Sequence, residues 1–177
     1  MILPVVKIPN KILLQKAKKV VKFDSKFLKL IKNMSDTLIA SKNPEGVGLA
    51  APQVGISIRL FVTRPTKRSK VRSYINPIIL KVDRIDSSKS EKKGTSTLEG
   101  CLSLDRIWSP ITRSLKIHLQ YQTFDKKMHI EWFEGFKATI MQHEIDHLNG
   151  ILFTKRAVEQ HSLVYEERNG KLEEIRI

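Results

Sequence analysis

Two histidines lie four residues apart in the segment His143-Glu144-Ile145-Asp146-His147. Side chains at that spacing project from one face of an α-helix, so both imidazoles can bind the same metal ion. Glu144 is their neighbour, close enough to exchange a proton with a bound water. Two histidines on a solvated helix face are the alternative, but the surrounding segment is otherwise apolar. The pattern therefore predicts a metal site with His143 and His147 as ligands.

A third ligand is needed, because a catalytic zinc-type site normally has three protein ligands and one open position. A protease of the zincin type would take it from downstream, where Glu159 and His161 are available, but the flanking residues do not follow the extended metzincin pattern. The other candidate is Cys101, in the segment EGCLS at 99–103. A free cysteine is usually a small buried hydrophobe, but the flanking glycine and serine favour a specially shaped backbone here.

The segment GVGLAAPQ at 46–53 satisfies the loose dinucleotide-binding pattern Gly-x-Gly-x-x-Gly/Ala. That pattern requires a strand before it and a helix after it. Here the polar segment SKNPE precedes it, and Pro52 falls in the first turns of the required helix. We therefore interpret the segment as a backbone wall beside the metal, where glycines permit close approach and Gln53 offers an amide donor.

Two helices are expected to position these residues. One is capped by Asp24 or Ser25, ends near Ser41 and has an apolar face. That face consists of Phe27, Ile31, Met34 and Leu38. The other covers about 135–148, and Gly150 lies just beyond its end, where a glycine can terminate it.

Short strands are expected at 59–62 and 74–80, a hairpin at 115–121 with 128–133, and a polar loop at 84–97. Asn169-Gly170 between two alternating runs predicts a C-terminal hairpin at about 162–177. These elements favour an α+β fold in which small antiparallel sheets surround a central helix carrying the two histidines. At this length we expect residues 1–177 to form a single domain.

Composition excludes several classes of protein. The chain has 177 residues, one cysteine and a formal net charge of +14. One cysteine excludes an internal disulfide, and with it a disulfide-stapled secreted scaffold. No uncharged apolar run approaches the ~18 residues of a membrane span, and the start MILPVVKIPNK has no small-residue cleavage site. We therefore expect a cytoplasmic protein with no membrane partner.

The positive charge is concentrated in the first half of the chain. Residues 1–42 contain ten Lys and Arg against two Asp and Glu, and residues 59–93 contain eleven against three. A solvated lysine-rich surface is one explanation, and contact with RNA or another polyanion is the other. Motif and aromatic signals for nucleic-acid binding are absent, and no DNA partner is expected.

The three segments, in this order, resemble the peptide deformylase family, which is marked by GxGxAAxQ, EGCxS and QHExDHxxG blocks. This sequence has GVGLAAPQ at 46–53, EGCLS at 99–103 and QHEIDHLNG at 142–150. The resemblance implies a metal-dependent hydrolase that removes the N-formyl group from the N-terminal formyl-methionine of newly made polypeptides and releases formate. It also implies that Cys101, His143 and His147 hold the metal and that Glu144 is the general base and acid. Fe(II) is the ion that the resemblance favours, with Zn(II) or another divalent ion as alternatives.

The resemblance further implies how the substrate is held. Gln53 and the backbone N–H of Leu102 would stabilise the oxyanion, and Gly48 and Gly100 would hold the peptide backbone like a strand added to a sheet edge. The pocket for the methionine side chain would be lined by Val47, Phe136 and Ile140.

The sequence departs from the family pattern at several positions. Members commonly have proline at the position of Asp105, a basic residue near Trp108 and arginine at Thr139. These departures concern peptide specificity rather than the metal chemistry. Arg113 is expected to pair with Glu99 and so orient the loop that carries the cysteine.

Two other functions are compatible with parts of the sequence. One is an HExxH-type metallo-endopeptidase, which would not need Cys101. The other is a non-catalytic ribosome- or RNA-binding protein that kept the fold. If the enzyme meets the ribosome, the basic N-terminal half is the expected contact, because the C-terminal tail is nearly neutral.

Overall fold

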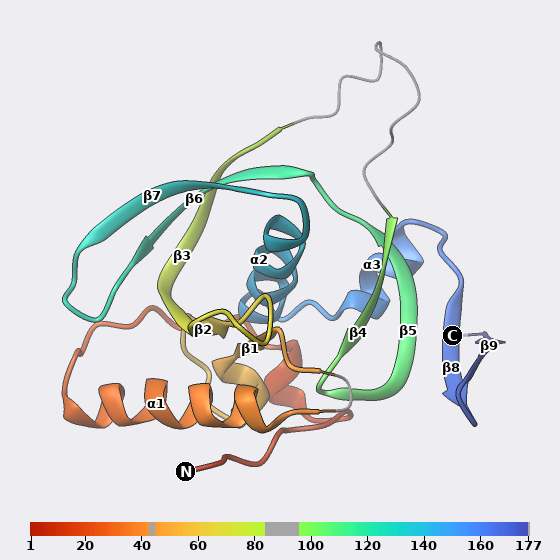
Figure 1. Cartoon of the computed structure of the whole chain (residues 1–177), viewed down its shortest axis with the longest axis horizontal. Helices are drawn as coiled ribbons and strands as arrows, with labels where there is room; N and C mark the ends of the chain where they lie inside the picture. The colour runs from red at the N-terminus through yellow and green to blue at the C-terminus, as the bar shows by residue number, and fades with distance from the viewer. Residues whose placement is uncertain (43–44, 84–95, 177) are drawn as a thin grey trace.

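Two antiparallel sheets and five helical segments make up the computed structural model, which describes residues 1–42, 45–83 and 96–176 (Figure 1). The five-stranded sheet has the order β1-β2-β3-β6-β7, and the four-stranded sheet has the order β4-β5-β8-β9. The strands of the first sheet are β1 (Gly48–Ala50), β2 (Leu60–Thr63), β3 (Arg72–Val82), β6 (Lys116–Gln122) and β7 (Met128–Glu134). Those of the second are β4 (Ser96–Cys101), β5 (Leu104–Thr112), β8 (Val164–Arg168) and β9 (Lys171–Ile175). The helical segments are η1 (Lys11–Leu14), α1 (Ser25–Ala40), η2 (Ala51–Val54), α2 (Gly135–Leu148) and α3 (Phe153–Glu159). The expected mixture of helices with antiparallel sheets is confirmed.

Helix α2 is buried over most of its surface, in nine of its fourteen residues. It packs on β1, β2, β6 and β7, and it lies between the two sheets in Figure 1. Its residues Ala138, Met141 and Ile145 belong to the same core cluster as Phe61 and Tyr74 of the five-stranded sheet. A helix buried on nearly all sides must also bury its polar side chains, which therefore need partners inside the protein.

Helix α1 confirms the helix predicted from Asp24 to Ser41. The Asp24 side chain accepts a hydrogen bond from the Phe27 backbone N–H at 2.9 Å, which satisfies one of the free donors of the first turn. Phe27, Met34 and Leu38 are buried in a cluster that includes Leu60 of β2. The apolar spacing of the sequence thus matches the face that packs on the sheet.

The two predicted hairpins correspond to paired strands. β6 and β7 are antiparallel in continuous register from the Lys116–Glu134 pair to the Gln122–Met128 pair. β8 and β9 are joined by Asn169 and Gly170, whose φ angles are 50° and 74°. Both residues have the positive φ that a type I′ turn requires, which explains why this dipeptide indicates a hairpin.

The structure contains several elements that the sequence did not predict, among them β1, η1 and η2. Residues 153–159 form α3, a third α-helix where two were expected. The sequence did not predict it, because seven residues are too few to show a helical period. β5 was not predicted, and β4 begins at Ser96, inside the expected loop at 84–97. Residues 84–95 of that loop lie outside the described residues. β4 and β5 are defined by pairing with each other and with β8, which local sequence does not reveal.

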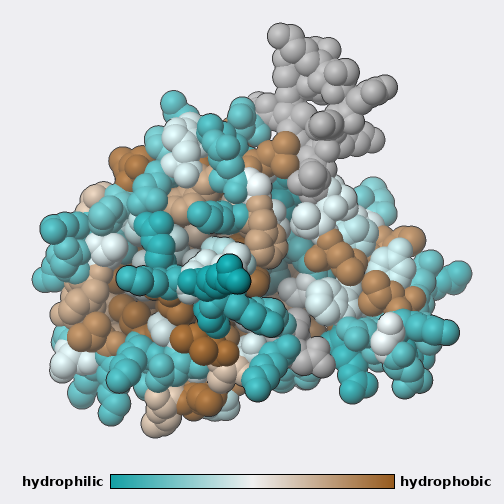
Figure 2. Space-filling view, in the orientation of Figure 1, coloured by the Kyte–Doolittle hydropathy of each residue, from teal (hydrophilic) through white to brown (hydrophobic). Residues whose placement is uncertain are grey.

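No helix in the described residues is long and apolar enough to cross a membrane. The face shown in Figure 2 is mixed, with hydrophilic residues spread across it and smaller hydrophobic areas between them. Large apolar side chains that remain exposed include Ile78, Ile130 and Trp132. The five-stranded sheet therefore leaves part of its apolar surface in contact with solvent.

Replacing Asp24 with alanine is expected to lower the free energy of unfolding by about 1 kcal/mol, because the first turn of α1 loses its side-chain acceptor. Urea unfolding of Asp24→Ala and of the wild type measures the difference. Asp24→Asn is the matched control, since asparagine caps helices as well as aspartate does. Equal losses in the two variants would contradict the capping role.

Candidate metal centre

Cys101, His143 and His147 meet at one point in the structure. Cys101 ends β4, and the two histidines lie on α2. Their ligand atoms all lie within 4.8 Å of one another, and the Cys101 Sγ lies 3.2 Å from the His147 Nε2. Within the described part of the chain this is the group of three that could hold a metal ion. Glu159, the downstream alternative, instead pairs with Arg156 at 2.9 Å.

Local backbone geometry directs the cysteine towards the helix. The register between β4 and β5 shifts between Gly100 and Cys101, where the chain turns from one strand into the next. Such irregularities re-aim a side chain at the end of a strand. The backbone N–H of Ser103 donates to the Cys101 Sγ at 3.4 Å, so the turn also holds the sulfur. The position of Cys101 therefore depends on the β4–β5 turn, as the flanking glycine and serine indicated.

The donor set fits a divalent metal. Cysteine sulfur and imidazole nitrogen are both ligands that bind zinc, and imidazole also suits iron; three such ligands leave a fourth position open. All three side chains are largely shielded, with exposed fractions of 3% for Cys101, 12% for His143 and 1% for His147. Burial raises the pKa of the Cys101 thiol, but the imidazoles of His147 and His143 lower it well below 9.0. The cluster thus favours the deprotonated thiol, which is the form that binds a metal.

His143 is held from its other side by a carboxylate. Its Nδ1 lies 2.9 Å from the Glu99 Oε2, which leaves Nε2 free to face the cysteine. Burial lowers the pKa of His143, whereas Cys101 and Glu99 raise it, and the result lies well above 6.5. Burial raises the pKa of Glu99, but hydrogen bonds from His143 and Arg113 bring it down to about 2. Glu99 therefore stays ionised and orients the imidazole.

Arg113 continues this chain of charges into the helix. Its Nε and Nη2 donate to the two carboxylate oxygens of Glu99 at 2.8 and 3.0 Å, as the sequence predicted. Its Nη1 donates to the Asp146 Oδ2 at 2.6 Å, and Arg156 binds the same carboxylate from the other side. Asp146 and Arg156 were missed by sequence reasoning, because neither spacing nor residue type shows which charges meet in the interior.

Glu144 lies against the backbone of β1. A Cβ at Gly48 would lie 2.2 Å from the Glu144 Oε1, so only glycine fits opposite this carboxylate. Glu144 is 3% exposed, and burial raises its pKa to about 7. Its Oε2 is buried and has no hydrogen-bond partner among the described residues. The sequence predicted that a group would approach the backbone closely at Gly48, and in the structure that group is the Glu144 carboxylate.

Gln53 points its amide at the sulfur. Its Nε2 lies 3.4 Å from the Cys101 Sγ and 3.3 Å from the Ser103 Oγ, and its Oε1 accepts from the Ala50 N–H at 2.8 Å. These contacts fix which end of the amide faces the site. The Gln53 amide is therefore a hydrogen-bond donor beside the proposed metal ligands, as the sequence predicted.

A cavity of about 290 Å³ borders the cluster. Every residue that the family resemblance assigned to substrate or oxyanion binding lines it: Val47, Gly48, Gln53, Gly100, Leu102, Phe136 and Ile140. His143 and Glu144 lie on its wall, as do Trp108 and Thr139, two of the positions that depart from the family pattern. The third, Asp105, pairs with Lys7 outside this cavity. We refer to this cavity as the groove.

Comparison with known proteins identifies the class of the chain. It matches the polypeptide deformylase family over residues 2–162. It is 37% identical to peptide deformylase 1 of Bacillus cereus over 156 residues, which is 88% of this chain and 92% of that protein. The crystal structure of peptide deformylase from Thermotoga maritima superimposes with a TM-score of 0.76 at 38% identity, covering 88% of this chain and 97% of that one. A Met-Ala-Ser-bound peptide deformylase from Acinetobacter baumannii gives a TM-score of 0.73 at 32% identity, with coverage of 88% and 98%.

The chain therefore belongs to the polypeptide deformylase family. This is a family of metal-dependent enzymes, and the Cys-His-His cluster described above is a site that fits such an ion.

Replacing Arg113 with alanine is expected to lower the free energy of unfolding by about 3–5 kcal/mol, because Glu99 loses its only arginine in the described structure and a buried ion pair is broken. Urea unfolding at matched metal content measures the loss. Arg156→Ala is the control. This variant removes an arginine that is 32% exposed and leaves Asp146 paired with Arg113. Its free energy of unfolding should therefore fall by less than that of Arg113→Ala. Equal losses would argue against the buried pair as the stabilising element.

Proposed function

We propose that this protein removes the formyl group from the N-terminal formyl-methionine of newly made polypeptides, releasing formate and a free amine. The observation that carries the proposal is the cluster of Cys101, His143 and His147, which borders the groove through His143 beside the groove-lining Glu144. The family match and the relative bound to Met-Ala-Ser support it, since a peptide that begins with methionine is what deformylation leaves.

The proposed ligands are Cys101, His143 and His147, with Fe(II) favoured by the family resemblance and Zn(II) or another divalent ion as alternatives. A divalent ion held there would polarise the formyl carbonyl and lower the pKa of water towards neutrality. Glu99 keeps the His143 imidazole oriented towards the site through the 2.9 Å contact to its Nδ1.

Glu144 is the proposed proton carrier. Its unpartnered Oε2 is buried, and the residue lines the groove, so it can reach a water that attacks the formyl carbon. As the water oxygen bonds to that carbon, Glu144 takes a proton from the water. It then delivers the proton to the amide nitrogen of the substrate, and the bond between the formyl carbon and this nitrogen breaks.

Two donors are proposed for the oxyanion that develops on the formyl oxygen. One is the Gln53 amide, which already faces the Cys101 sulfur, and the other is the backbone N–H of Leu102. Removing one such donor typically lowers the rate by about 10²–10³.

The substrate backbone is proposed to lie along β4. β4 is at the edge of its sheet and is paired on one side with β5, so a peptide can add as a further strand beside Gly100. Val47, Phe136 and Ile140 would then take the methionine side chain. An acetyl group carries an additional methyl, and its steric exclusion would explain selectivity for formyl.

We further propose that residues 1–177 act as one domain with α2 as the central, HExxH-bearing helix. The proposed location is the cytoplasm, where new polypeptides are made. The excess of Lys and Arg in residues 1–42 and 59–93 supports a transient ribosome contact through the N-terminal half of the chain.

Replacing Glu144 with glutamine is expected to lower formate release from a formyl-Met peptide by about 10²–10⁴-fold, because the proton carrier is lost. Metal content should be unchanged, since Glu144 is not a proposed ligand. The assay uses anaerobically purified protein, with metal analysis of the same samples. Glu134→Gln is the control, because Glu134 is 65% exposed and pairs with Lys116. Full activity of Glu144→Gln would contradict the proposed role.

Replacing Cys101 with alanine is expected to lower both bound metal and formate release, whereas His161→Ala should change neither. An HExxH-type endopeptidase that takes its third ligand downstream would show the reverse pattern. It would also cut internal bonds of an unformylated peptide. Ribosome binding that falls with salt, in a protein that releases no formate, would favour the non-catalytic alternative.

A further inference from the structure

The C-terminal hairpin reaches the groove through a tryptophan. β8 and β9 lie beyond residue 162, where the family match ends, yet they belong to the same sheet as β4. On β5, Trp108 is paired with Gly100 of β4 on one side and with Tyr165 of β8 on the other. The sheet therefore connects the strand that ends at the metal centre to a hairpin outside the matched region.

The indole of Trp108 forms part of the groove wall. A Cβ at Gly100 would lie 2.6 Å from the Trp108 Cζ3, so the ring lies directly against the backbone of β4. Trp108 is also one of the residues that line the groove. An aromatic ring that is contacted only on its face can still rotate about its side-chain bonds. A contact at its edge is therefore needed to hold the ring in one rotamer against the groove.

Glu167 fixes that edge. The Trp108 Nε1 donates to the Glu167 Oε2 at 3.0 Å. Glu167 is two residues from Tyr165 on β8, so it lies diagonally from Trp108 on the same face of the sheet. The neighbouring charges have other partners, since Arg168 binds Glu166 at 2.6 Å and Glu173 at 3.4 Å.

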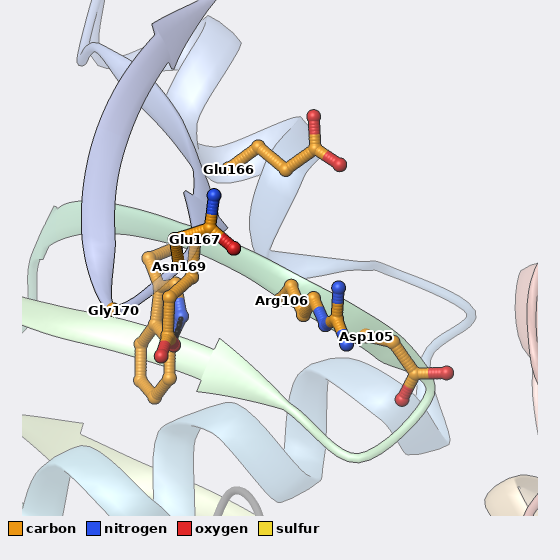
Figure 3. Close-up of a pocket in the computed structure, with 7 residues that line it drawn as sticks. Asp105, Arg106, Glu166, Glu167, Asn169 and Gly170 are labelled. Carbon is orange, nitrogen blue, oxygen red and sulfur yellow. Dashed lines mark hydrogen bonds between the residues drawn. The ribbon is translucent and has the colours of Figure 1, made fainter.

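Trp108 also separates the groove from a second cavity. This cavity has a volume of about 760 Å³ and is lined by Asp105, Arg106, Trp108, Glu166, Glu167, Asn169 and Gly170 (Figure 3). Figure 3 shows Glu167 and Asn169 together at the end of the hairpin, with Asp105 and Arg106 on the neighbouring β4–β5 segment. None of these residues is one of the three proposed ligands. Trp108 therefore borders both cavities, at the position paired with Gly100 of β4.

We infer that Glu167 is a positioning residue that holds the Trp108 indole as the wall of the groove, so that the C-terminal hairpin sets the affinity for the part of the peptide that follows the methionine. The inference rests on the proposed function. A peptide that extends from the metal centre along β4 would pass Gly100 and the Trp108 ring that lies against its backbone. Loss of the Glu167 acceptor should therefore weaken binding of longer peptides without altering the chemistry at the formyl carbon.

The test compares formyl-Met-Ala-Ser with formyl-methioninamide, which lacks the later residues. Glu167→Ala is expected to raise KM for formyl-Met-Ala-Ser about three- to tenfold, the range for one lost hydrogen bond. kcat should stay within about twofold, as should kcat/KM for formyl-methioninamide. Glu167→Gln should behave like the wild type, because the glutamine oxygen can still accept the indole N–H. Glu174→Ala, an exposed carboxylate on β9, is the matched control and should also behave like the wild type.

A double-mutant cycle tests the contact itself. Trp108→Phe removes the indole N–H, so adding Glu167→Ala to it should raise KM no further. An independent optical readout uses Trp132→Phe, which leaves Trp108 as the one tryptophan of the two in the chain. In that background Glu167→Ala should increase quenching of the emission by acrylamide.

The outcomes separate the two proposals. No formate from the wild type would overturn the proposed function and this inference with it. Formate release with an unchanged KM in Glu167→Ala would overturn the inference alone. Equal losses on both substrates, or additive effects of Trp108→Phe and Glu167→Ala, would also overturn it, because both indicate a general structural effect.

Discussion

The buried ion pair between Arg113 and Glu99 is the interaction on which the metal centre depends. Both side chains are only 6% exposed, so each charge has lost most of its water and needs a partner of opposite sign. Because Glu99 lies on β4 and Arg113 also binds Asp146 on α2, the pair fixes the strand that carries Cys101 against the helix that carries the histidines. Glu99 then orients His143. A single network thus sets both the distance between the elements and the direction of a ligand.

Two glycines lie where a Cβ atom would collide with a side chain of the site. Gly48 leaves room for the Glu144 carboxylate, and Gly100 leaves room for the Trp108 ring. In both cases the absent Cβ allows a functional side chain to lie against a strand backbone, which a larger residue would displace. The sequence pattern placed glycines beside the site, and the structure identifies the side chains of this chain that use the space.

The sequence predicts the parts of the molecule that depend on local pattern. The Asp24 cap, the apolar face of α1 and the Asn169-Gly170 turn all follow from residue type and spacing. Two histidines four apart define a helix face, whereas the cysteine ligand and the substrate-binding residues were assigned through the resemblance to the deformylase family. Asp146 and Glu167 could not be placed, because their partners lie far away in the sequence. β5 was missed although it follows β4 after a short turn, and only its pairing with β8 is distant. Trp108 was noticed only as a departure from the family pattern, and its partner lies fifty-nine positions away.

The two edges of the four-stranded sheet differ in how they meet other chains. β9, at one edge, is mostly exposed and carries Lys171, Glu173 and Glu174, and such charges discourage a second molecule from extending the sheet there. β4, at the other edge, carries Leu98 and Gly100 beside a carboxylate that is already engaged in the interior. The sheet is thus protected against self-association on one side and open to an extended chain on the other. The proposed peptide-binding strand has only six residues, Ser96–Cys101, and its register shift at Gly100 and Cys101 interrupts the regular pairing that a second molecule could extend.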